Sequence, residues 1–345
     1  MTLRVGIGLF TGQIPSDSPR TFAEEYRDTL EMVRRAEALG FDSAWVSEHH
    51  GTSDGYLPSL LTMLAAFAAV TERIGLGTGV VLTPLHDPVR LAEDAAVVDQ
   101  LSSGRLILGL GLGWREEEFR MLRIPIEERL ARHIDTIQIL RRAWSGERFS
   151  FEGKAFRYED VRVVPPPFRK GGPPIFLGGY TAASARRVGN LADGYVVDAD
   201  DLGEVRHAMD LAEEAAREAG RDPAALALAL MVNAWVSESG DPWSEIREGV
   251  IHQIGSYDAW DEGHDTASHD SLEPRRLTEE ELRDSTVAGT PGEVAEELRR
   301  RIESFRERRE LHLIVRLHYP GMQLQPAARA MELFAEGVLP ALREA

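Results

Sequence analysis

Short apolar runs alternate eight times with longer segments of helical periodicity along this 345-residue chain. The first run, Leu3–Leu9, is followed by Phe22–Leu39, in which apolar residues recur three and four positions apart up to the glycine at position 40. Repeated units of this kind predict parallel strands covered by helices. Eight units with no linker between two halves favour one closed (β/α)₈ barrel over an open, doubly wound sheet.

The other expected strands are Ser43–Val46, Ile74–Leu82, Arg105–Leu110, Ile175–Leu177, Gly194–Val197, Leu226–Val236 and Leu311–Leu317. After the expected fourth helix, Glu127–Trp144, the segment Phe149–Pro167 alternates aromatic residues and predicts a small hairpin. After the seventh strand, Gly255–Asp284 is acidic with little apolar periodicity, which is typical of a lid or a mobile insertion. The sequence therefore predicts a single TIM-barrel domain, residues 1–345, with insertions after strands 4 and 7, the second at about 255–285.

The composition excludes several classes of site and partner. Because the chain has no cysteine, it can form no disulfide, thiolate zinc site, iron–sulfur cluster or cysteine nucleophile. A formal charge of −18 argues against binding to nucleic acid, whose phosphates would be repelled. The start lacks the apolar run of a signal peptide, and no stretch of ~18 apolar residues could span a membrane. We therefore expect a cytoplasmic protein.

In a barrel of this kind the functional groups lie at the carboxyl ends of the strands. The clearest signal there is Gly178-Gly179-Tyr180-Thr181, between the fifth strand and its helix. Two glycines allow close backbone approach, and the helix that follows presents free N–H groups and a positive dipole end, which together bind phosphate. The alternative is a tight turn in which Thr181 is the N-cap.

Glycines also mark the third and fourth strands. Gly109, Gly111 and Gly113 alternate along the fourth, and Gly77 and Gly79 along the third. Glycine on the inner face of a strand clears room for a ligand, so two neighbouring stripped strands predict a slot for a planar ring at the barrel mouth. The alternative is that bulky side chains from other strands fill that space.

Glu48-His49-His50 places a carboxylate and two imidazoles at the end of the second strand. Histidine titrates near working pH and can act as a general base or bind a developing anion, although a structural role is also open. Adjacent strand residues point to opposite faces, so His49 and His50 do not share one ion easily, and no H-x-H motif or later carboxylate completes a ligand set. We therefore expect no metal site.

Taken in order along the chain, these motifs resemble the bacterial-luciferase-like flavin-dependent oxidoreductases, and the resemblance covers nearly all of it. The matching elements are Ser47-Glu48-His49-His50, Gly77-Thr78-Gly79-Val80, Pro88–Asp94, Gly104-Arg105, Gly109–Trp114, Glu118-Phe119, Gly178-Gly179, Ala192-Asp193-Gly194 and Gly289–Val294. The resemblance implies a barrel that binds FMN, or the deazaflavin F420, as a diffusible cosubstrate, with a cis peptide bond between Gly79 and Val80. It also implies an oligomer, commonly a homodimer.

The same resemblance implies site residues. His49 matches the family's active-site histidine, Glu118 matches an acidic position near the flavin, and Glu48 belongs to the same catalytic group. The cofactor would contact Thr78, Gly79, Val80, Gly111, Gly178, Gly179, Tyr180 and Thr181. One departure is Leu112, where luciferase has an arginine that reaches the flavin phosphate. Backbone N–H groups, or a cation such as Arg115 or Arg186, would have to take its place.

The leading hypothesis is a two-component monooxygenase that uses reduced FMN and O₂ on a small, partly apolar substrate, with a separate flavin reductase as partner. The alternative keeps the fold but uses F420 for hydride transfer. The chain's acidity favours FMN, because the long acidic tail of F420 requires cations. A non-catalytic flavin-binding protein and a metal-dependent barrel hydrolase are further hypotheses from other classes.

Overall fold

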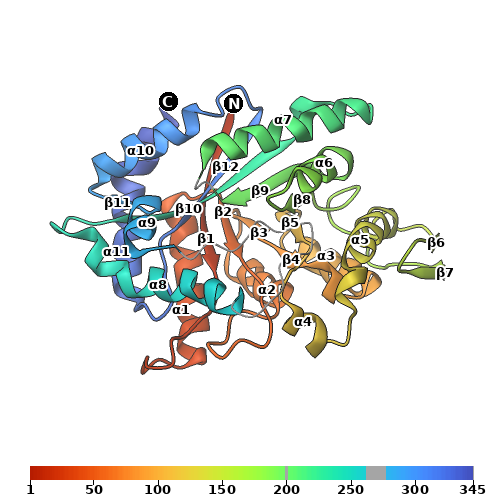
Figure 1. The fold of residues 1–345 in the computed structure, drawn as a ribbon, viewed down its shortest axis with the longest axis horizontal. Helices are drawn as coiled ribbons and strands as arrows, with labels where there is room; N and C mark the ends of the chain where they lie inside the picture. Colours follow the sequence, from red (N-terminus) through yellow and green to blue (C-terminus); the bar gives the residue numbers. More distant parts are fainter. Residues whose placement is uncertain (199–200, 262–276, 345) are drawn as a thin grey trace.

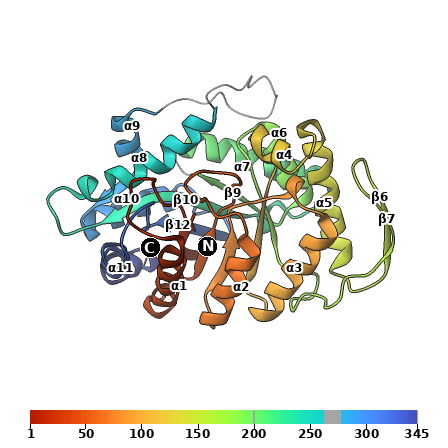
Figure 2. The same ribbon diagram turned by 90° about the horizontal axis from the view of Figure 1, so that it is seen from below.

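The computed structural model describes residues 1–198, 201–261 and 277–344. Eight parallel strands close into a barrel with helices around it, as Figures 1 and 2 show. These strands are β1 (Thr2–Phe10), β2 (Ser43–Val46), β3 (Gly75–Thr78), β5 (Leu106–Gly111), β8 (Ile175–Gly178), β9 (Gly194–Asp198), β10 (Ala227–Val236) and β12 (Glu310–Arg316). Pairing of β12 with both β1 and β10, and of β10 with β9, closes the ring. The predicted barrel is confirmed.

The larger surrounding helices follow the strands in the alternating order that the sequence predicts. They are α1 (Phe22–Leu39), α2 (Leu60–Val70), α3 (Pro88–Leu101), α5 (Arg129–Ala143), α6 (Ala182–Leu191), α7 (Leu202–Glu218), α10 (Pro291–Glu303) and α11 (Leu324–Leu333), with α12 (Leu339–Arg343) after a π-turn. Local signals set their ends: Thr21 caps α1 in a capping box with Glu24, and Gly40 ends it in the left-handed region at φ +89°. None of the described helices is long and apolar enough to cross a membrane.

The inside of the barrel is filled by side chains of alternate strand residues. Trp45 and Phe176 meet His312 there, with ring centroids 6.1 and 5.5 Å from the imidazole. The intervening residues point outward into the larger core under the helices, as the period of two along a strand requires. The barrel is therefore a packed core, and any ligand must bind above it, at the strand ends.

This packing decides between the two readings of the glycine-rich strands. A Cβ atom on Gly77 would lie 2.2 Å from the ring of Trp45, and one on Gly109 would lie 1.9 Å from the carbonyl oxygen of Thr78. Gly111 is similarly close to the side chain of Val80, at 2.3 Å. The expected open slot at these positions is wrong, because neighbouring strands occupy the space that the missing side chains leave.

Some predicted boundaries need correction. Ile74–Leu82, expected as one strand, is divided into β3 and β4 (Val81–Leu82) at a cis peptide bond between Gly79 and Val80, the bond that the resemblance implied. A second non-proline cis bond, between Gly8 and Leu9, was not foreseen. The predicted hairpin in Phe149–Pro167 is confirmed as antiparallel β6 (Phe149–Glu152) and β7 (Arg157–Val161).

Sequence reasoning also missed several elements. A short helix, α4 (Glu116–Met121), follows β5 before the expected fourth helix, with a 3₁₀ turn at Ile126–Glu128. In the expected insertion after strand seven, α8 (Pro242–Asp261) and α9 (Glu279–Ser285) occupy both ends, so those ends are helical. A short strand, β11 (Val287–Gly289), was also missed, and it pairs with the end of β10. The middle of that insertion, residues 262–276, lies outside the described residues.

Candidate active site

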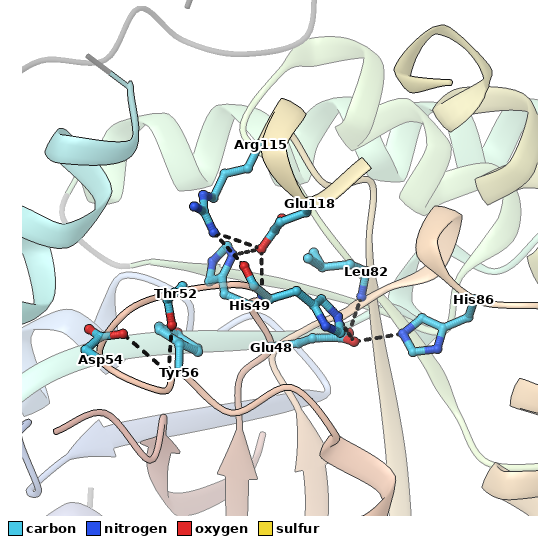
Figure 3. Close-up of polar contacts among 10 residues, drawn as sticks. Glu48, His49, Thr52, Asp54, Tyr56, Leu82, His86, Arg115 and Glu118 are labelled. Atoms are coloured by element: carbon cyan, nitrogen blue, oxygen red, sulfur yellow. Dashed lines mark hydrogen bonds and ion pairs between the residues drawn. The ribbon is translucent and has the colours of Figure 1, made fainter. Parts of the chain in front are cut away.

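His49 and Glu118 form a buried pair at the carboxyl end of the barrel (Figure 3). His49 follows β2, and its Nδ1 lies 2.8 Å from Oε1 of Glu118 on α4. The ring of Tyr56 meets the imidazole edge-on at 4.8 Å between centroids. Since Nδ1 faces the carboxylate, Nε2 is the ring nitrogen that could exchange a proton with a reactant. The structure thus brings together two predicted catalytic residues that are 69 positions apart.

Glu118 holds more than the imidazole. Its Oε1 also accepts hydrogen bonds from the backbone N–H of His50 at 2.9 Å and from Nη1 of Arg115 at 3.3 Å. The same Arg115 nitrogen donates to the carbonyl of His50. Both charged side chains are buried, so the guanidinium supplies the counter-charge that an enclosed carboxylate needs. Arg115, which the sequence considered as a cation for the phosphate, is therefore engaged in this group.

Glu48, predicted with His49, belongs to a second group of side chains. Its Oε1 lies 2.8 Å from Nε2 of His50 and 2.8 Å from Nε2 of His86, and its Oε2 accepts the backbone N–H of Leu82 at 2.7 Å. Burial alone would raise the pKa of Glu48, but the two histidines lower it to about 2. Burial opposes charge on His86, yet the carboxylate raises its pKa overall.

This second group also contains three potential metal ligands. One atom each from Glu48, His50 and His86 lies within 4.8 Å of the other two. Sequence reasoning compared the adjacent pair His49 and His50, which do face opposite sides, and found no third ligand. His86 gave no signal, because it stands in the 3₁₀ turn region before α3, far along the chain and outside any motif.

Asp54 links the loop after β2 to α8. Its Oδ2 accepts a hydrogen bond from Gln13 Nε2 at 2.7 Å and lies 3.0 Å from Nε2 of His252. Burial would raise the pKa of Asp54, but hydrogen bonds from His252, Gln13 and Thr52 lower it to about 2. The sequence did not single out these residues: no motif contains Gln13 or Asp54, and no helix was predicted for the segment that holds His252.

The turn from β8 to α6 fits a phosphate group. Gly179 has φ +145°, and a Cβ there would lie 2.6 Å from the side chain of Ser184. Thr181 is the N-cap: its hydroxyl accepts the N–H of Ser184, whose own hydroxyl accepts the N–H of Thr181. The N–H groups of Ala182 and Ala183 remain outside the helical ladder, as at any helix start. The Thr181 cap is therefore compatible with anion binding at the same turn.

The other residues expected at the cofactor lie around the β3–β4 break. Thr78 is buried and its hydroxyl donates to the carbonyl of Gly109, while the N–H of Gly79 donates to Val46. Val80 sits between the positions of Gly111 and Gly178, in van der Waals reach of both. Tyr180 is exposed and its hydroxyl donates to Asp198. Of the cations considered for the phosphate, Arg186 lies 3.6 Å from Glu214, on the neighbouring α7.

The chain is similar to known proteins over most of its length. Residues 3–308 match the luciferase-like monooxygenase family. An F420-dependent glucose-6-phosphate dehydrogenase of Intrasporangium calvum is 29% identical over 342 residues, covering 93% of this chain and 97% of that protein. The enzyme of the same description from Segniliparus rotundus is 28% identical, covering 93% and 96%.

Solved structures show the same fold. Monooxygenase RslO1 from Streptomyces bottropensis superposes with a TM-score of 0.79 at 25% identity, covering 99% of this chain and all of that one. An F420-dependent secondary alcohol dehydrogenase in complex with an F420–acetone adduct gives a TM-score of 0.79 at 18% identity, with 99% and 100% coverage.

Proposed function

The chain belongs to the luciferase-like monooxygenase family, and we propose that it is an F420-dependent oxidoreductase that exchanges a hydride with an alcohol or the corresponding carbonyl compound. The observation that carries the proposal is the full-length likeness to relatives described as F420-dependent dehydrogenases. The sequence hypothesis placed FMN first on the ground of net charge. Net charge describes the whole surface, however, and does not report the charges around one pocket.

The residues present fit such a cofactor. The turn Gly178–Thr181 and the start of α6 would hold a phosphate, and Thr78–Val80 would lie beside the ring. When bound, F420 supplies or accepts the hydride. The protein contributes the binding surface, the orientation of the substrate and the transfer of the proton.

The proton step is assigned to His49. Nε2 of His49 would accept the hydroxyl proton of an alcohol as the alcohol is oxidised, and it would return a proton to the oxygen when a carbonyl compound is reduced. Glu118, 2.8 Å from Nδ1, fixes the orientation of the imidazole and stabilises its charged form. Arg115 lies 3.3 Å from the buried carboxyl group of Glu118 and supplies a counter-charge there, so the three side chains act as one unit.

Cofactor titration tests the proposal directly. We expect purified protein to quench F420 fluorescence at lower cofactor concentrations than it quenches FMN fluorescence. With F420 bound, a panel of secondary alcohols and sugar phosphates, glucose-6-phosphate included, should contain a compound that bleaches the oxidised cofactor. His49→Ala should retain F420 binding and lose the bleaching. Tighter binding of FMN, with no bleaching of F420 by any alcohol, would contradict the proposal.

A second candidate keeps the monooxygenase reaction with reduced FMN and O₂. It is favoured by the likeness to RslO1, which extends over 99% of the chain at 25% identity. Under this alternative a separate flavin reductase is the required partner. Mixing the protein and reduced FMN with O₂ in a stopped-flow instrument would give a transient flavin–oxygen absorbance, which the F420 proposal does not predict. The homodimer stays a prediction under both, and sedimentation velocity tests it.

A further inference from the structure

The side chains of Glu48, His50 and His86 form a compact group. Figure 3 shows Glu48 and His86 beside the proposed catalytic pair of His49 and Glu118. Both imidazoles of the group approach the same carboxylate oxygen, Oε1 of Glu48, through Nε2 at 2.8 Å. Glu48 and His50 are two residues apart after β2, so they share a face, while His49 between them turns to Glu118. His86 reaches the group from the segment before α3. Two imidazoles and one carboxylate thus converge on one point.

We propose that Glu48, His50 and His86 bind one divalent transition-metal ion of the zinc class. Imidazole nitrogen and carboxylate oxygen are the ligands that such ions take, and three protein ligands leave a position for water. The three ligand atoms lie within 4.8 Å of one another, so modest side-chain movement brings all of them to bonding distance. The proposal does not depend on which cofactor the protein uses.

The electrostatics of the group support a cation. In the described part of the chain, no arginine or lysine nitrogen lies within 4.0 Å of Glu48, whose ion-pair partners are the two histidines. Glu118, by contrast, has Arg115 at 3.3 Å. When both imidazoles bind an ion in their neutral form, the carboxylate gives the ligand set a net charge of −1, which attracts a divalent cation. The ion would take the place of the two Nε2···Oε1 contacts, with each imidazole bound through Nε2 as the neutral form that keeps its proton on Nδ1.

The surroundings meet two further requirements of a metal site. Ligating carboxylates are themselves held by hydrogen bonds, and Oε2 of Glu48 accepts the N–H of Leu82 at 2.7 Å. An ion also needs a path inward. The side chains of His50 and His86 are 13% and 33% exposed, whereas Glu48 is enclosed, so the site opens through its histidines. A bound ion would fix Glu48 and, through Leu82, the strand β4.

Metal binding to the full-length, untagged protein tests the proposal. After treatment with a chelator, Zn²⁺ should bind at one ion per chain in competition with a chromophoric chelator, and the melting temperature should rise by a few degrees. Co²⁺ should give visible d–d bands, which report direct nitrogen and oxygen coordination. Less than half an ion per chain, or Co²⁺ bands no different from those of the aqueous ion, would overturn the proposal.

Variants localise the ion. Because His86 is at the rim, His86→Gln should fold normally, and we expect it to weaken Zn²⁺ binding by at least about 10- to 100-fold. Glu48→Gln should do the same, since it removes the charge but keeps an oxygen for Leu82. The matched control is His207→Ala, an exposed histidine on α7 that should leave binding unchanged. Zn²⁺ affinity that is equal in all four proteins would place the ion elsewhere and refute the assignment.

Discussion

The neighbouring histidines His49 and His50 contact two different buried glutamates, and the counter-charges beside these glutamates differ. His49 faces Glu118, which has the permanent cation Arg115 beside it. His50 faces Glu48, whose second partner is another imidazole, His86. A guanidinium keeps its charge at every working pH, so it closes the Glu118 group to other cations. Imidazoles can release protons, so the Glu48 group can exchange them for a metal ion. The type of counter-charge therefore distinguishes the two groups: arginine beside Glu118 suits the proposed proton-transfer site, and imidazoles beside Glu48 suit the proposed metal site.

The largest contrast should appear in turnover. His49→Ala removes the proposed proton acceptor and should lower the rate of F420 reduction by about 10²–10⁴-fold. His50→Ala should give a smaller loss, because that side chain acts on the Glu48 group. Single-turnover rates at saturating cofactor measure both, and circular dichroism checks the folding of each variant. Equal losses would remove the distinction between the two histidines.

The next contrast concerns stability. Arg115→Met leaves the Glu118 carboxylate buried without its cation and should cost about 3–5 kcal/mol in the free energy of unfolding. His86→Gln, in metal-free protein, should cost only about 1 kcal/mol because a hydrogen bond is weakened at a half-open site. Urea unfolding gives both values. The double variant Arg115→Met/Glu118→Leu should recover part of the first loss, since it removes both charges; no recovery would argue against an electrostatic cause.

A third glutamate–histidine contact, between Glu25 and His318, sharpens the comparison, because burial is the largest cause of the pKa shifts of both residues. Oε1 of Glu25 lies 3.8 Å from Nδ1 of His318. Burial raises the pKa of Glu25 from 4.5 to about 7 despite the nearby Arg20, with Asp28 acting in the same direction as burial. Burial also lowers the pKa of His318 to about 4. Between pH 4.5 and 6.5 both side chains are therefore mainly neutral in the folded protein.

The sign of the pH effect follows from proton binding. Between pH 4.5 and 7 the folded chain holds a proton on Glu25 that the unfolded chain has lost, so this residue makes stability fall as pH rises. Glu25→Gln should therefore gain about 1–3 kcal/mol relative to the original protein over that interval. His318 acts in the opposite direction between pH 4 and 6.5, but it is present in both proteins and cancels in the difference. Urea unfolding at several pH values measures this difference, and a constant one would contradict the shift.

The smallest expected effect is that of Glu48→Gln in metal-free protein. The amide keeps an acceptor for Leu82 but loses the charge that strengthens the contacts to His50 and His86, at a cost of about 1 kcal/mol. With Zn²⁺ present the gap to the original protein should widen, because the original protein binds the ion more tightly and gains more binding energy. Thermal unfolding with and without Zn²⁺ measures both gaps. A gap that stays constant would separate Glu48 from metal binding.

Much of the fold could be predicted from the sequence because its signals are local. The period of two in the strands, the helical period between them and caps such as Thr21 and Gly40 report which face each element buries. The hairpin in Phe149–Pro167 was predicted from such a local pattern. The cis bond before Val80 was predicted from the family resemblance. The elements missed were short, as are α4, α9 and β11, or had no clear apolar face in their sequence, as is the case for the whole of α8.

The candidate site, like the fold, was predicted only in part from the sequence. The sequence by itself placed His49, Glu48 and the Gly178–Thr181 turn at strand ends, and the resemblance added Glu118. Only the tertiary structure paired His49 with Glu118, moved Glu48 to a group with His86, and filled the space beside Gly77 with Trp45. The physical reason is that periodicity fixes which way a residue faces within its own element. Which residue it then meets depends on closure of the barrel, which brings together strand ends and turns that lie tens of positions apart.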